Sequence, residues 1–554
     1  MTALSAQMMR TPLMLSSLIS HAARESGDTE IVTRRIEGGV HRTTWRKLET
    51  RARQLAQALL RLGCKPGDRV ATLAWNSDRH LELYYGTSGS QLVCHTINPR
   101  LHDDQIAWII NDAADRILCF DMTFLPLVER LRPLLTGVRH FIAMTSTAHL
   151  PVSAALPGLL SQDALIDAED GDWQWSEFDE NTASSLCYTS GTTGDPKGAL
   201  YSHRSTILHA YAAAMADGMA LCSRDVVLPA VPMFHVNAWG LPYTAAMVGA
   251  KLVFPGQALD GNSLFELCEA EGVTFAAGVP TVWLGLVERL RERGDHLSTL
   301  RRAVVGGATC PPSLMRTLTE DFGIEVRHAW GMTEMSPLGT VNTPAASTSA
   351  ADESVQLARL AKQGRALFGV ELCVIDDEGR LLPRDGCSAG TLLARGPWVI
   401  ERYAGHSESA LIEVDGRSWF ATGDVATIDH DGLLNITDRS KDVIKSGGEW
   451  ISSIELENIA MTHPAVKEAA AVGYHHPKWD ERPLLLVALS HGSTATREEI
   501  LSCFHGRIAR WQVPDDVVFL DDLPRTATGK IQKRLLREQY RNHICRTTEN
   551  GDTA

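Results

Sequence analysis

The chain has 554 residues, a length that predicts two or more domains around a large apolar core. Its composition, 44% hydrophobic and 22% charged, is ordinary for a soluble globular enzyme. The formal net charge of −14 argues against a protein that coats nucleic acid, so no nucleic-acid partner is expected.

The sequence also indicates a compartment. The N-terminus has no charged start followed by an apolar core, so we expect no signal peptide. No uninterrupted apolar stretch reaches about 18 residues, which predicts no membrane span. The 11 cysteines form no CxxC pair, so neither a zinc site nor a disulfide framework is indicated. A reducing, cytoplasmic location is therefore predicted.

Short apolar runs alternate with helical patterns over the first two thirds of the chain. Such alternation predicts βαβ units and largely parallel sheets with helices on both faces. A helix is expected to start near Ser202 and to run through Met215. The predicted strands span residues 70–74, 92–94, 117–120, 226–228, 251–254, 273–275 and 303–305.

The sequence pattern changes near Gly364, where short strand-like runs separated by turns predict a β-rich subdomain up to residue 437. The last part reads as a compact α+β unit, with strands at 469–472, 484–487 and 517–519 and helices at 497–508 and 532–540. The predicted fold class is therefore α/β, with a large N-terminal domain of two αβ-layered sheets plus the β-rich subdomain, and a small mobile α+β C-terminal domain. The expected boundaries are 1–437 for the N-terminal domain, 438–445 for a charged hinge and 446–554 for the C-terminal domain.

A loop rich in glycine, serine and threonine runs from Tyr188 to Gly198. Small residues let backbone N–H groups approach a polyphosphate, hydroxyls add donors, and Lys197 supplies a charge. It is not a Walker A loop, because Asp195 and Pro196 separate the last glycine from the lysine. The candidate phosphate-binding residues are Thr189, Ser190, Gly191, Thr192, Thr193, Gly194 and Lys197.

Four further motifs follow in order. Residues 330–334 combine an aromatic ring, a hydroxyl and a carboxylate, which suit a base, a phosphate and Mg²⁺. Residues 419–424 end in an aspartate after a glycine turn, suited to ribose hydroxyls. Residues 438–450 combine cations with a glycine pair, and residues 524–530 place a single lysine at the tip of a glycine turn.

These motifs, in this order and spacing, resemble the adenylate-forming (ANL) superfamily of acyl-CoA synthetases, luciferases and peptide-synthetase adenylation domains. The resemblance covers nearly the whole chain. Through residues 231–240, 328–334 and 445–452 it is most similar to bacterial medium- and long-chain fatty acyl-CoA synthetases of the alkane-degradation type, and also to methylmercaptopropionate-CoA ligases.

The resemblance implies a reaction in two steps. A carboxylate attacks the α-phosphate of ATP to give acyl-adenylate and pyrophosphate, and the thiol of coenzyme A then displaces AMP. It implies ATP, Mg²⁺, coenzyme A and a small-molecule carboxylate as partners, and a homodimer. The small domain is expected to adopt a different pose for each step.

The resemblance also implies roles for individual residues. In the nucleotide site, it places Thr189 and Glu334 at the metal ion and Thr333 at the α-phosphate. It places Asp424 and Arg439 at the ribose. The residues expected around adenine are Gly307, His328, Ala329 and Trp330. In the C-terminal domain, which is expected to move, the resemblance places Lys441 at the hinge and Lys445 and Trp450 on the thioester-forming surface. It also implies that the charge of Lys530 lowers the repulsion between the carboxylate and the α-phosphate. In the acyl pocket, it implies roles for His235 and for Trp239, which would act as a gate to the pocket.

Simpler interpretations stand beside these roles. His235 and Trp239 could be ordinary core residues, and Cys310 has no partner in sequence that would make it a nucleophile. Trp330 stands where many members have tyrosine, and Trp450 differs from the residues of aryl-CoA ligases. The alternative functions are a 3-methylmercaptopropionate-CoA ligase, an adenylation domain loading a carrier protein, for which no carrier motif follows Lys530, and an oxygenase of the luciferase kind.

Overall fold

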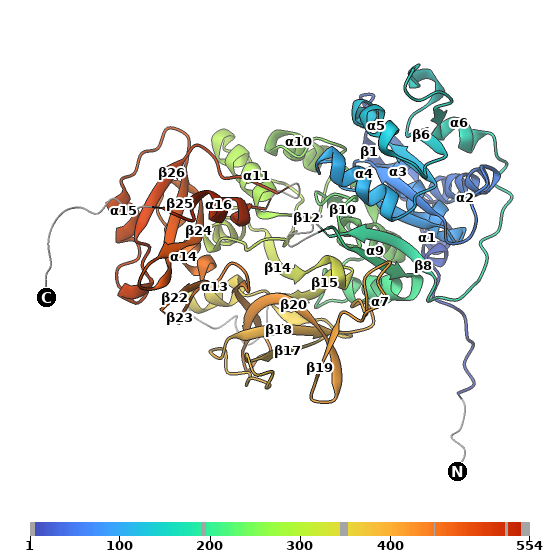
Figure 1. Cartoon of the computed structure of the whole chain (residues 1–554). Coiled ribbons are helices and arrows are strands. Elements are labelled where there is room, and N and C mark those ends of the chain that lie inside the picture. The colour runs from blue at the N-terminus through green and yellow to red at the C-terminus, as the bar shows by residue number, and fades with distance from the viewer. Residues whose placement is uncertain (1–5, 190–194, 344–352, 448, 527–529, 544–554) are drawn as a thin grey trace, which may run out of the picture.

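The computed structural model describes residues 6–189, 195–343, 353–447, 449–526 and 530–543. These residues form four β-sheets with helices packed against them (Figure 1). Within this described part, no helix is both long and apolar enough to span a bilayer. The predicted fold class is confirmed.

Two large sheets make up most of the molecule, and their neighbouring strands are mainly parallel. The nine-stranded sheet has the order β16 (Arg365–Ala366), β15 (Leu338–Val341), β14 (Glu325–Gly331), β13 (Arg302–Val305), β12 (Phe275–Gly278), β10 (Val226–Pro229), β11 (Lys251–Phe254), β1 (Glu30–Arg34), β2 (Val40–Thr44). The seven-stranded sheet has the order β7 (Leu160–Ser161), β6 (His140–Ala143), β5 (Ile117–Phe120), β3 (Arg69–Leu73), β4 (Val93–Thr96), β8 (Ala183–Tyr188), β9 (Gly198–Ser202). The parallel pairs require crossover connections, which helices provide.

Two smaller sheets follow in the chain. The first has the order β17 (Glu371–Ile375), β18 (Gly390–Arg395), β20 (Arg417–Ile428), β19 (Leu411–Val414), with β21 (Leu434–Arg439) also paired to β20. The second has the order β23 (Glu449–Ile451), β22 (Ile444–Ser446), β25 (Asp480–Leu489), β24 (Val466–His476), with β26 (Asp516–Leu520) paired to β25. Only residues 440–443 separate β21 from β22, so the chain passes from one sheet to the other over a short turn.

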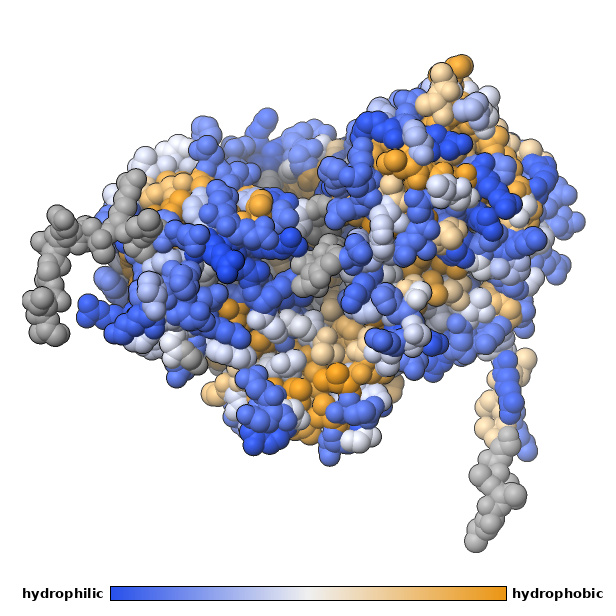
Figure 2. Space-filling model, viewed as in Figure 1, coloured by the Kyte–Doolittle hydropathy of each residue, from blue (hydrophilic) through white to orange (hydrophobic). Residues whose placement is uncertain are grey.

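The helices lie on the faces of these sheets, and those of the C-terminal part gather with β22–β26 at one end of the molecule (Figure 1). They are α1 (Leu15–Glu25), α2 (Trp45–Arg61), α3 (Asp78–Gly89), α4 (Asp103–Asp112), α5 (Leu125–Leu131), α6 (Gln162–Asp167), α7 (His203–Ala214), α8 (Val236–Trp239), α9 (Leu241–Val248), α10 (Gly261–Glu271), α11 (Pro280–Arg293), α12 (Pro312–Arg316), α13 (Glu353–Ala361), α14 (Ser453–Ala460), α15 (Arg497–Ser502) and α16 (Lys533–Tyr540). Figure 2 shows a largely hydrophilic face, with apolar residues gathered over the lobe that carries β17, β18 and β19.

Most predicted elements are present, with small shifts at their ends. Ser202 is the N-cap of α7, and its side chain accepts a hydrogen bond from the backbone N–H of Ser205, as expected of a helix starting there. The strand expected at 273–275 begins only at Phe275, because the N–H of Val273 donates to the carbonyl of Cys268 (3.0 Å).

The helix predicted over 497–508 is wrong in its second half. The helix α15 ends at Ser502, and the chain then turns through i→i−3 hydrogen bonds such as that from the His505 N–H to the Ser502 carbonyl (3.2 Å). The turn directs Phe504 into the core of the C-terminal part, where it is fully buried. Tertiary burial therefore overrides the local helical pattern.

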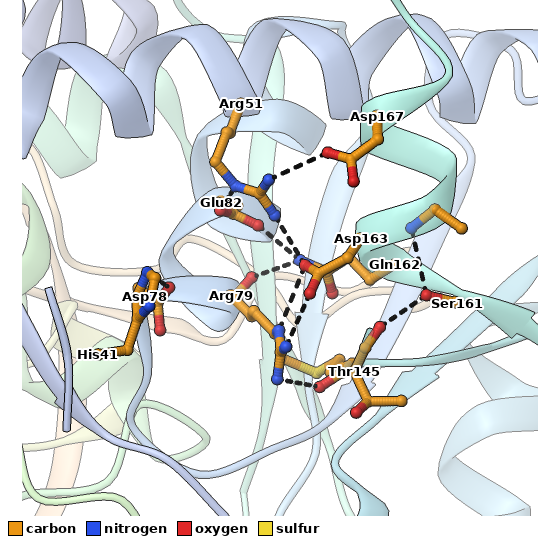
Figure 3. A network of polar contacts seen from close by, with 12 residues as sticks. His41, Arg51, Asp78, Arg79, Glu82, Thr145, Ser161, Gln162, Asp163 and Asp167 are labelled. Atoms are coloured by element: carbon orange, nitrogen blue, oxygen red, sulfur yellow. Dashed lines mark hydrogen bonds and ion pairs between the residues drawn. The ribbon is translucent and has the colours of Figure 1, made fainter. Parts of the chain in front are cut away.

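A buried network of ion pairs joins α2, α3 and α6 (Figure 3). Arg79 donates to Asp163 (2.7 Å) and to Glu37 (2.6 Å). Arg51 also pairs with Asp163 (2.7 Å) and with Glu82, whose second oxygen accepts from Gln162 (2.9 Å). A buried pair is costly to break, because the remaining partner keeps an uncompensated charge.

We expect Arg79→Met to lower the free energy of unfolding by about 3–5 kcal/mol, because Asp163 and Glu37 would lose their shared cation inside the protein. Asp167→Asn is the matched control, since the Asp167 side chain is 71% exposed and pairs only loosely with Arg51 (3.5 Å); its effect should stay within about 0.5 kcal/mol. Urea unfolding followed by far-UV circular dichroism measures both, and equal effects would contradict a structural role for the network.

Candidate active site

The Gly/Ser/Thr loop connects two paired strands. β8 ends at Tyr188 and β9 begins at Gly198, and these two residues pair across the antiparallel ladder. The Thr189 N–H donates to the Lys197 carbonyl (2.9 Å), and the Lys197 N–H donates to Thr189 Oγ1 (3.3 Å). The loop therefore leaves and re-enters the sheet at one point. Its predicted phosphate-binding residues Ser190, Gly191, Thr192, Thr193 and Gly194 lie outside the described residues.

The Trp-Gly-Met-Thr-Glu motif lies at the end of β14, where Thr333 and Glu334 begin a short 3₁₀ turn. The turn is held from two directions. The hydroxyl of Tyr201, on β9, donates to the Thr333 carbonyl (2.5 Å), and the Ile400 N–H donates to the Glu334 carbonyl (2.8 Å). The Thr and Glu side chains thus take their position from β9 and from the segment after β18.

Glu334 is the carboxylate predicted to bind Mg²⁺, and it is only 8% exposed. Within the described residues, no three His, Cys, Asp or Glu side chains gather as a metal cluster. Mg²⁺ in nucleotide sites uses one or two carboxylates and takes its other ligands from phosphates and water. A single buried carboxylate near the loop therefore fits a metal ion carried by the nucleotide, and Thr189 and Glu334 stay the predicted ligands.

Asp424, predicted for ribose, is joined to two other predicted residues. Trp330 Nε1 donates to Asp424 Oδ2 (2.9 Å), and Arg439 Nε lies 2.8 Å from Asp424 Oδ1. Asp424 and Arg439 face each other across β20 and β21. Burial raises the pKa of Asp424, and the charge of Arg439 opposes that rise. Each carboxylate oxygen has a second lone pair, so ribose hydroxyls can still donate to it.

The residues predicted around adenine are mostly covered by protein. The Trp330 ring is 8% exposed, and a Cβ at Gly339 would lie 2.7 Å from Trp330 Cζ3, so β15 packs against the ring. The His328 ring is 2% exposed and its Nδ1 lies 3.0 Å from the Ala361 carbonyl oxygen. Burial lowers the pKa of His328 to about 4. Ala329 is buried too, and Gly307 adopts φ +77°, where a side chain would be strained.

Lys530 reaches this site from the C-terminal part. Its turn is closed by the Thr526 N–H, which donates to the Lys530 carbonyl (2.6 Å), and by the Lys530 N–H, which donates to Thr526 Oγ1 (3.2 Å). The ammonium interacts favourably with the carboxylates of Glu334 and Asp424.

Burial, together with the nearby Arg439 and Lys441, lowers the pKa of Lys530 to about 8. Burial and then the charge of Lys530 lower the pKa of His235 to about 3, so that imidazole is neutral at pH 7. A neutral ring can border an acyl chain without adding charge.

Trp239 ends an unusual turn. Val236, Asn237, Ala238 and Trp239 all adopt left-handed φ values between 46° and 56°, a conformation that costs roughly 1–2 kcal/mol for each residue with a side chain. The Asn237 amide holds the turn: its Nδ2 donates to Ser185 Oγ (3.0 Å) and its Oδ1 accepts from the Tyr84 hydroxyl (3.2 Å).

The turn presses the Trp239 indole against a glycine pair. The side chain is 6% exposed, and a Cβ at Gly306 would lie 3.2 Å from Trp239 Cη2. A Cβ at Gly307 would lie 3.5 Å from Trp239 Cζ2. The glycines thus make room for the ring. Backbone strain of this kind persists where the surroundings impose it, and it is concentrated at functional sites.

The remaining predicted residues of the C-terminal part are Lys441, Lys445 and Trp450. Lys445 and Trp450 are opposite each other on β22 and β23, and both are exposed. Lys441 lies in the turn between β21 and β22, and its carbonyl accepts a hydrogen bond from Arg537 on α16. The charges of Lys530 and Lys441 therefore act on Asp424, whereas Lys445 and Trp450 are exposed to solvent.

Sequence reasoning missed three residues that position the site, namely Tyr201, Tyr403 and Asn237. The Tyr403 hydroxyl donates to Glu334 Oε1 (2.9 Å), and the Lys197 ammonium lies 5.0 Å from the centroid of the Tyr403 ring. No spacing in the sequence indicates these contacts, because each joins segments far apart in the chain.

Comparison with known proteins identifies the family. Residues 19–404 match the family model described as AMP-binding enzyme, and residues 455–530 match that of the AMP-binding enzyme C-terminal domain. The chain is 53% identical to the 3-methylmercaptopropionyl-CoA ligase of Ruegeria lacuscaerulensis, over 97% of this chain and 99% of that protein. It is 51% identical to the medium-chain-fatty-acid–CoA ligase of Ectopseudomonas oleovorans, over 98% and 99%.

A solved structure has the same fold. The crystal structure of an anthranilate CoA ligase in complex with anthranoyl-AMP matches with a TM-score of 0.84 and 25% identity, over 96% of this chain and 98% of that one. The resemblance inferred from the five motifs is confirmed, and the chain belongs to the family of AMP-binding enzymes, as an acid–thiol ligase of the adenylate-forming type.

Proposed function

We propose that this protein is an ATP-dependent fatty acid–CoA ligase that prefers acids of medium length. It would join a carboxylate to ATP as an acyl-adenylate with release of pyrophosphate, and then exchange AMP for coenzyme A. The single observation that carries the proposal is the contact of Trp330 and Arg439 with Asp424 (2.9 and 2.8 Å), at a site where the charge of Lys530 also acts. The relatives above, two of them acyl-CoA ligases at about half identity, support the same reaction class.

The roles of the residues follow from charge and position. Two anions, a carboxylate and an α-phosphate, must meet in the first step, and the Lys530 ammonium would reduce their repulsion. Asp424, kept in place by Arg439 and Trp330, would accept hydrogen bonds from ribose. Mg²⁺ bound with ATP would neutralise phosphate charge beside Glu334.

The acyl chain would lie along the Trp239 turn. Val236, Ala238 and Trp239 give this turn an apolar character, and neutral His235 adds no charge. A second candidate substrate is 3-methylmercaptopropionate, because one relative with 53% identity is a ligase for that acid. Both acids share a carboxylate and an apolar tail, so they differ here mainly in the length of tail that must be buried.

We also propose that the enzyme works as a cytoplasmic homodimer with domain boundaries at 1–437, 438–445 and 446–554. The passage from β21 to β22 between two sheets supports the hinge, and the family resemblance supports the dimer. Light scattering coupled to size-exclusion chromatography tests the dimer, and a mass of 60.6 kDa would contradict it.

The reaction is tested by pyrophosphate release from ATP over a series of straight-chain acids from two to sixteen carbons, together with 3-methylmercaptopropionate, with and without coenzyme A. We expect the highest kcat/KM for a medium-length acid and full turnover only with coenzyme A. A maximum at the thioether acid would favour the second candidate. Turnover that is independent of coenzyme A would contradict a CoA ligase.

The first prediction concerns the pH dependence of adenylation. A lysine with a pKa of about 8 is charged below that pH and loses its proton as the pH rises through it. We therefore expect kcat/KM for ATP in acid-dependent pyrophosphate exchange to fall above pH 8. Lys530→Arg should abolish this alkaline fall, because arginine stays protonated, whereas Lys530→Ala should lose about 10²–10³ in rate. An alkaline fall that survives in Lys530→Arg would assign it to another group.

A second prediction tests the gate. A buried methylene contributes about 0.8 kcal/mol, so a movable wall at Trp239 would select acids by length. Trp239→Ala should shift the preference toward longer acids, with shorter acids losing affinity. Trp511→Ala, at a tryptophan that is 43% exposed, is the control and should leave the profile unchanged. If Trp239 is only a core residue, its variant should instead lose about 3–5 kcal/mol of stability with an unaltered profile of chain length.

A third prediction tests the hinge at Lys441. Proline restricts φ to about −65°, and hinge residues must change their backbone angles between poses. Lys441→Pro should retain pyrophosphate exchange and lose most thioester formation, whereas Lys441→Ala should retain both. The two half-reactions, measured separately with acid plus ATP and with preformed acyl-adenylate plus coenzyme A, decide the matter. Equal loss of both half-reactions in the proline variant would place the hinge elsewhere.

A further inference from the structure

The segment after β18 is attached to both sides of the phosphate region. At its start, the Ile400 N–H donates to the Glu334 carbonyl (2.8 Å). At its end, the Ala404 N–H donates to the Gly198 carbonyl (2.8 Å). A Cβ at Gly198 would lie 3.2 Å from the Cβ of Ala404, so the two strands of chain approach closely. Residues 400–404 therefore bridge the metal-site turn and the base of the Gly/Ser/Thr loop.

Tyr403 lies in the middle of this bridge and contacts a functional residue on each side. Its hydroxyl donates to Glu334 Oε1 (2.9 Å), and Lys197 Nζ lies 5.0 Å from the centre of its ring. The second distance falls within the range of a cation–π interaction. A tyrosine hydroxyl is protonated at neutral pH, so it is the donor in this hydrogen bond to the carboxylate.

The hydroxyl and the ring of Tyr403 contact different residues and therefore have different roles. The hydroxyl donates to Oε1 of Glu334 and so restricts the rotation of the carboxylate, which leaves Oε2 as the oxygen that could bind a metal ion. The ring attracts the Lys197 ammonium, whose flexible chain would otherwise sample many rotamers. Groups that orient a metal ligand from behind typically change metal affinity by about 10–100-fold when removed.

We propose that Tyr403 is a positioning residue that sets Glu334 for the nucleotide-bound metal ion through its hydroxyl and sets Lys197 for the phosphates through its ring. The proposal rests on the proposed function, because it assigns the two partners to a metal–nucleotide site. The proposal assigns one role to the hydroxyl and another to the ring of Tyr403. A variant that lacks only the hydroxyl distinguishes the two roles.

The test measures binding of α,β-methylene-ATP, which cannot form an adenylate, by isothermal titration calorimetry across a series of Mg²⁺ concentrations and in EDTA. Tyr403→Phe keeps the ring and loses the hydroxyl, whereas Tyr403→Leu loses both. Tyr211→Phe is the matched control, since Tyr211 is 57% exposed on α7 and the variant removes the same hydroxyl from the surface.

Tyr403→Phe should raise the half-saturating Mg²⁺ concentration by about 10-fold or more, with the affinity in EDTA unchanged. Tyr403→Leu should show the same Mg²⁺ effect and should also bind the nucleotide more weakly in EDTA. In the Tyr403→Leu background, Lys197→Ala should cause a smaller further loss than it causes in the wild type, because the ring no longer orients the lysine. Tyr211→Phe should match the wild type throughout.

An unchanged Mg²⁺ midpoint in Tyr403→Phe would overturn the role of the hydroxyl, and a lowered melting temperature with that unchanged midpoint would show that Tyr403 only packs. Fully additive effects of Tyr403→Leu and Lys197→Ala would overturn the role of the ring. Wild-type protein that binds no nucleotide at any Mg²⁺ concentration would refute the proposed function itself, and the inference with it. The experiment therefore distinguishes a failure of the role proposed for Tyr403 from a failure of the proposed function.

Discussion

The balance of charge around Lys530 is the constraint on which the site depends. The half-buried Lys530 ammonium interacts with two carboxylates, Glu334 and Asp424, and two cations, Arg439 and Lys441. An unpaired charge in such surroundings would be strongly unfavourable, and the carboxylates offset that penalty. Burial, together with the two cations, lowers the pKa of Lys530 to about 8, and the two carboxylates oppose that shift.

The nine-stranded sheet and the sheet that contains β20 and β21 hold the side chains of the site in place. β14 delivers Trp330, Thr333 and Glu334, while β20 and β21 deliver Asp424 and Arg439 in register. Tyr201 and Tyr403 then join β9 and the segment after β18 to the same turn. The functional groups thus come from paired strands and from the short turn after β14.

In the Trp239 turn, the surrounding structure holds the backbone in an unfavourable conformation. Four consecutive left-handed residues are unfavourable by themselves, and a buried amide, Asn237, compensates through hydrogen bonds to Ser185 and Tyr84. A right-handed turn at these residues would aim the indole elsewhere, away from Gly306 and Gly307. The strain therefore determines where the indole lies, and the proposed acyl pocket depends on that position.

The sequence by itself determined the class of fold, the order of the motifs and the family, because periodicity, small-residue loops and motif spacing are local properties of the chain. It predicted strand positions such as 117–120 and 251–254 and a helix that starts near Ser202, because the local pattern of apolar and polar residues indicates them. It did not predict that α15 ends at Ser502, since the burial of Phe504 decides that. It could not reveal Tyr403 between Lys197 and Glu334, or Asn237 beneath Trp239, because these contacts join distant segments. Only the tertiary structure brings such segments together, and hydrogen bonds and desolvation then give the side chains their roles.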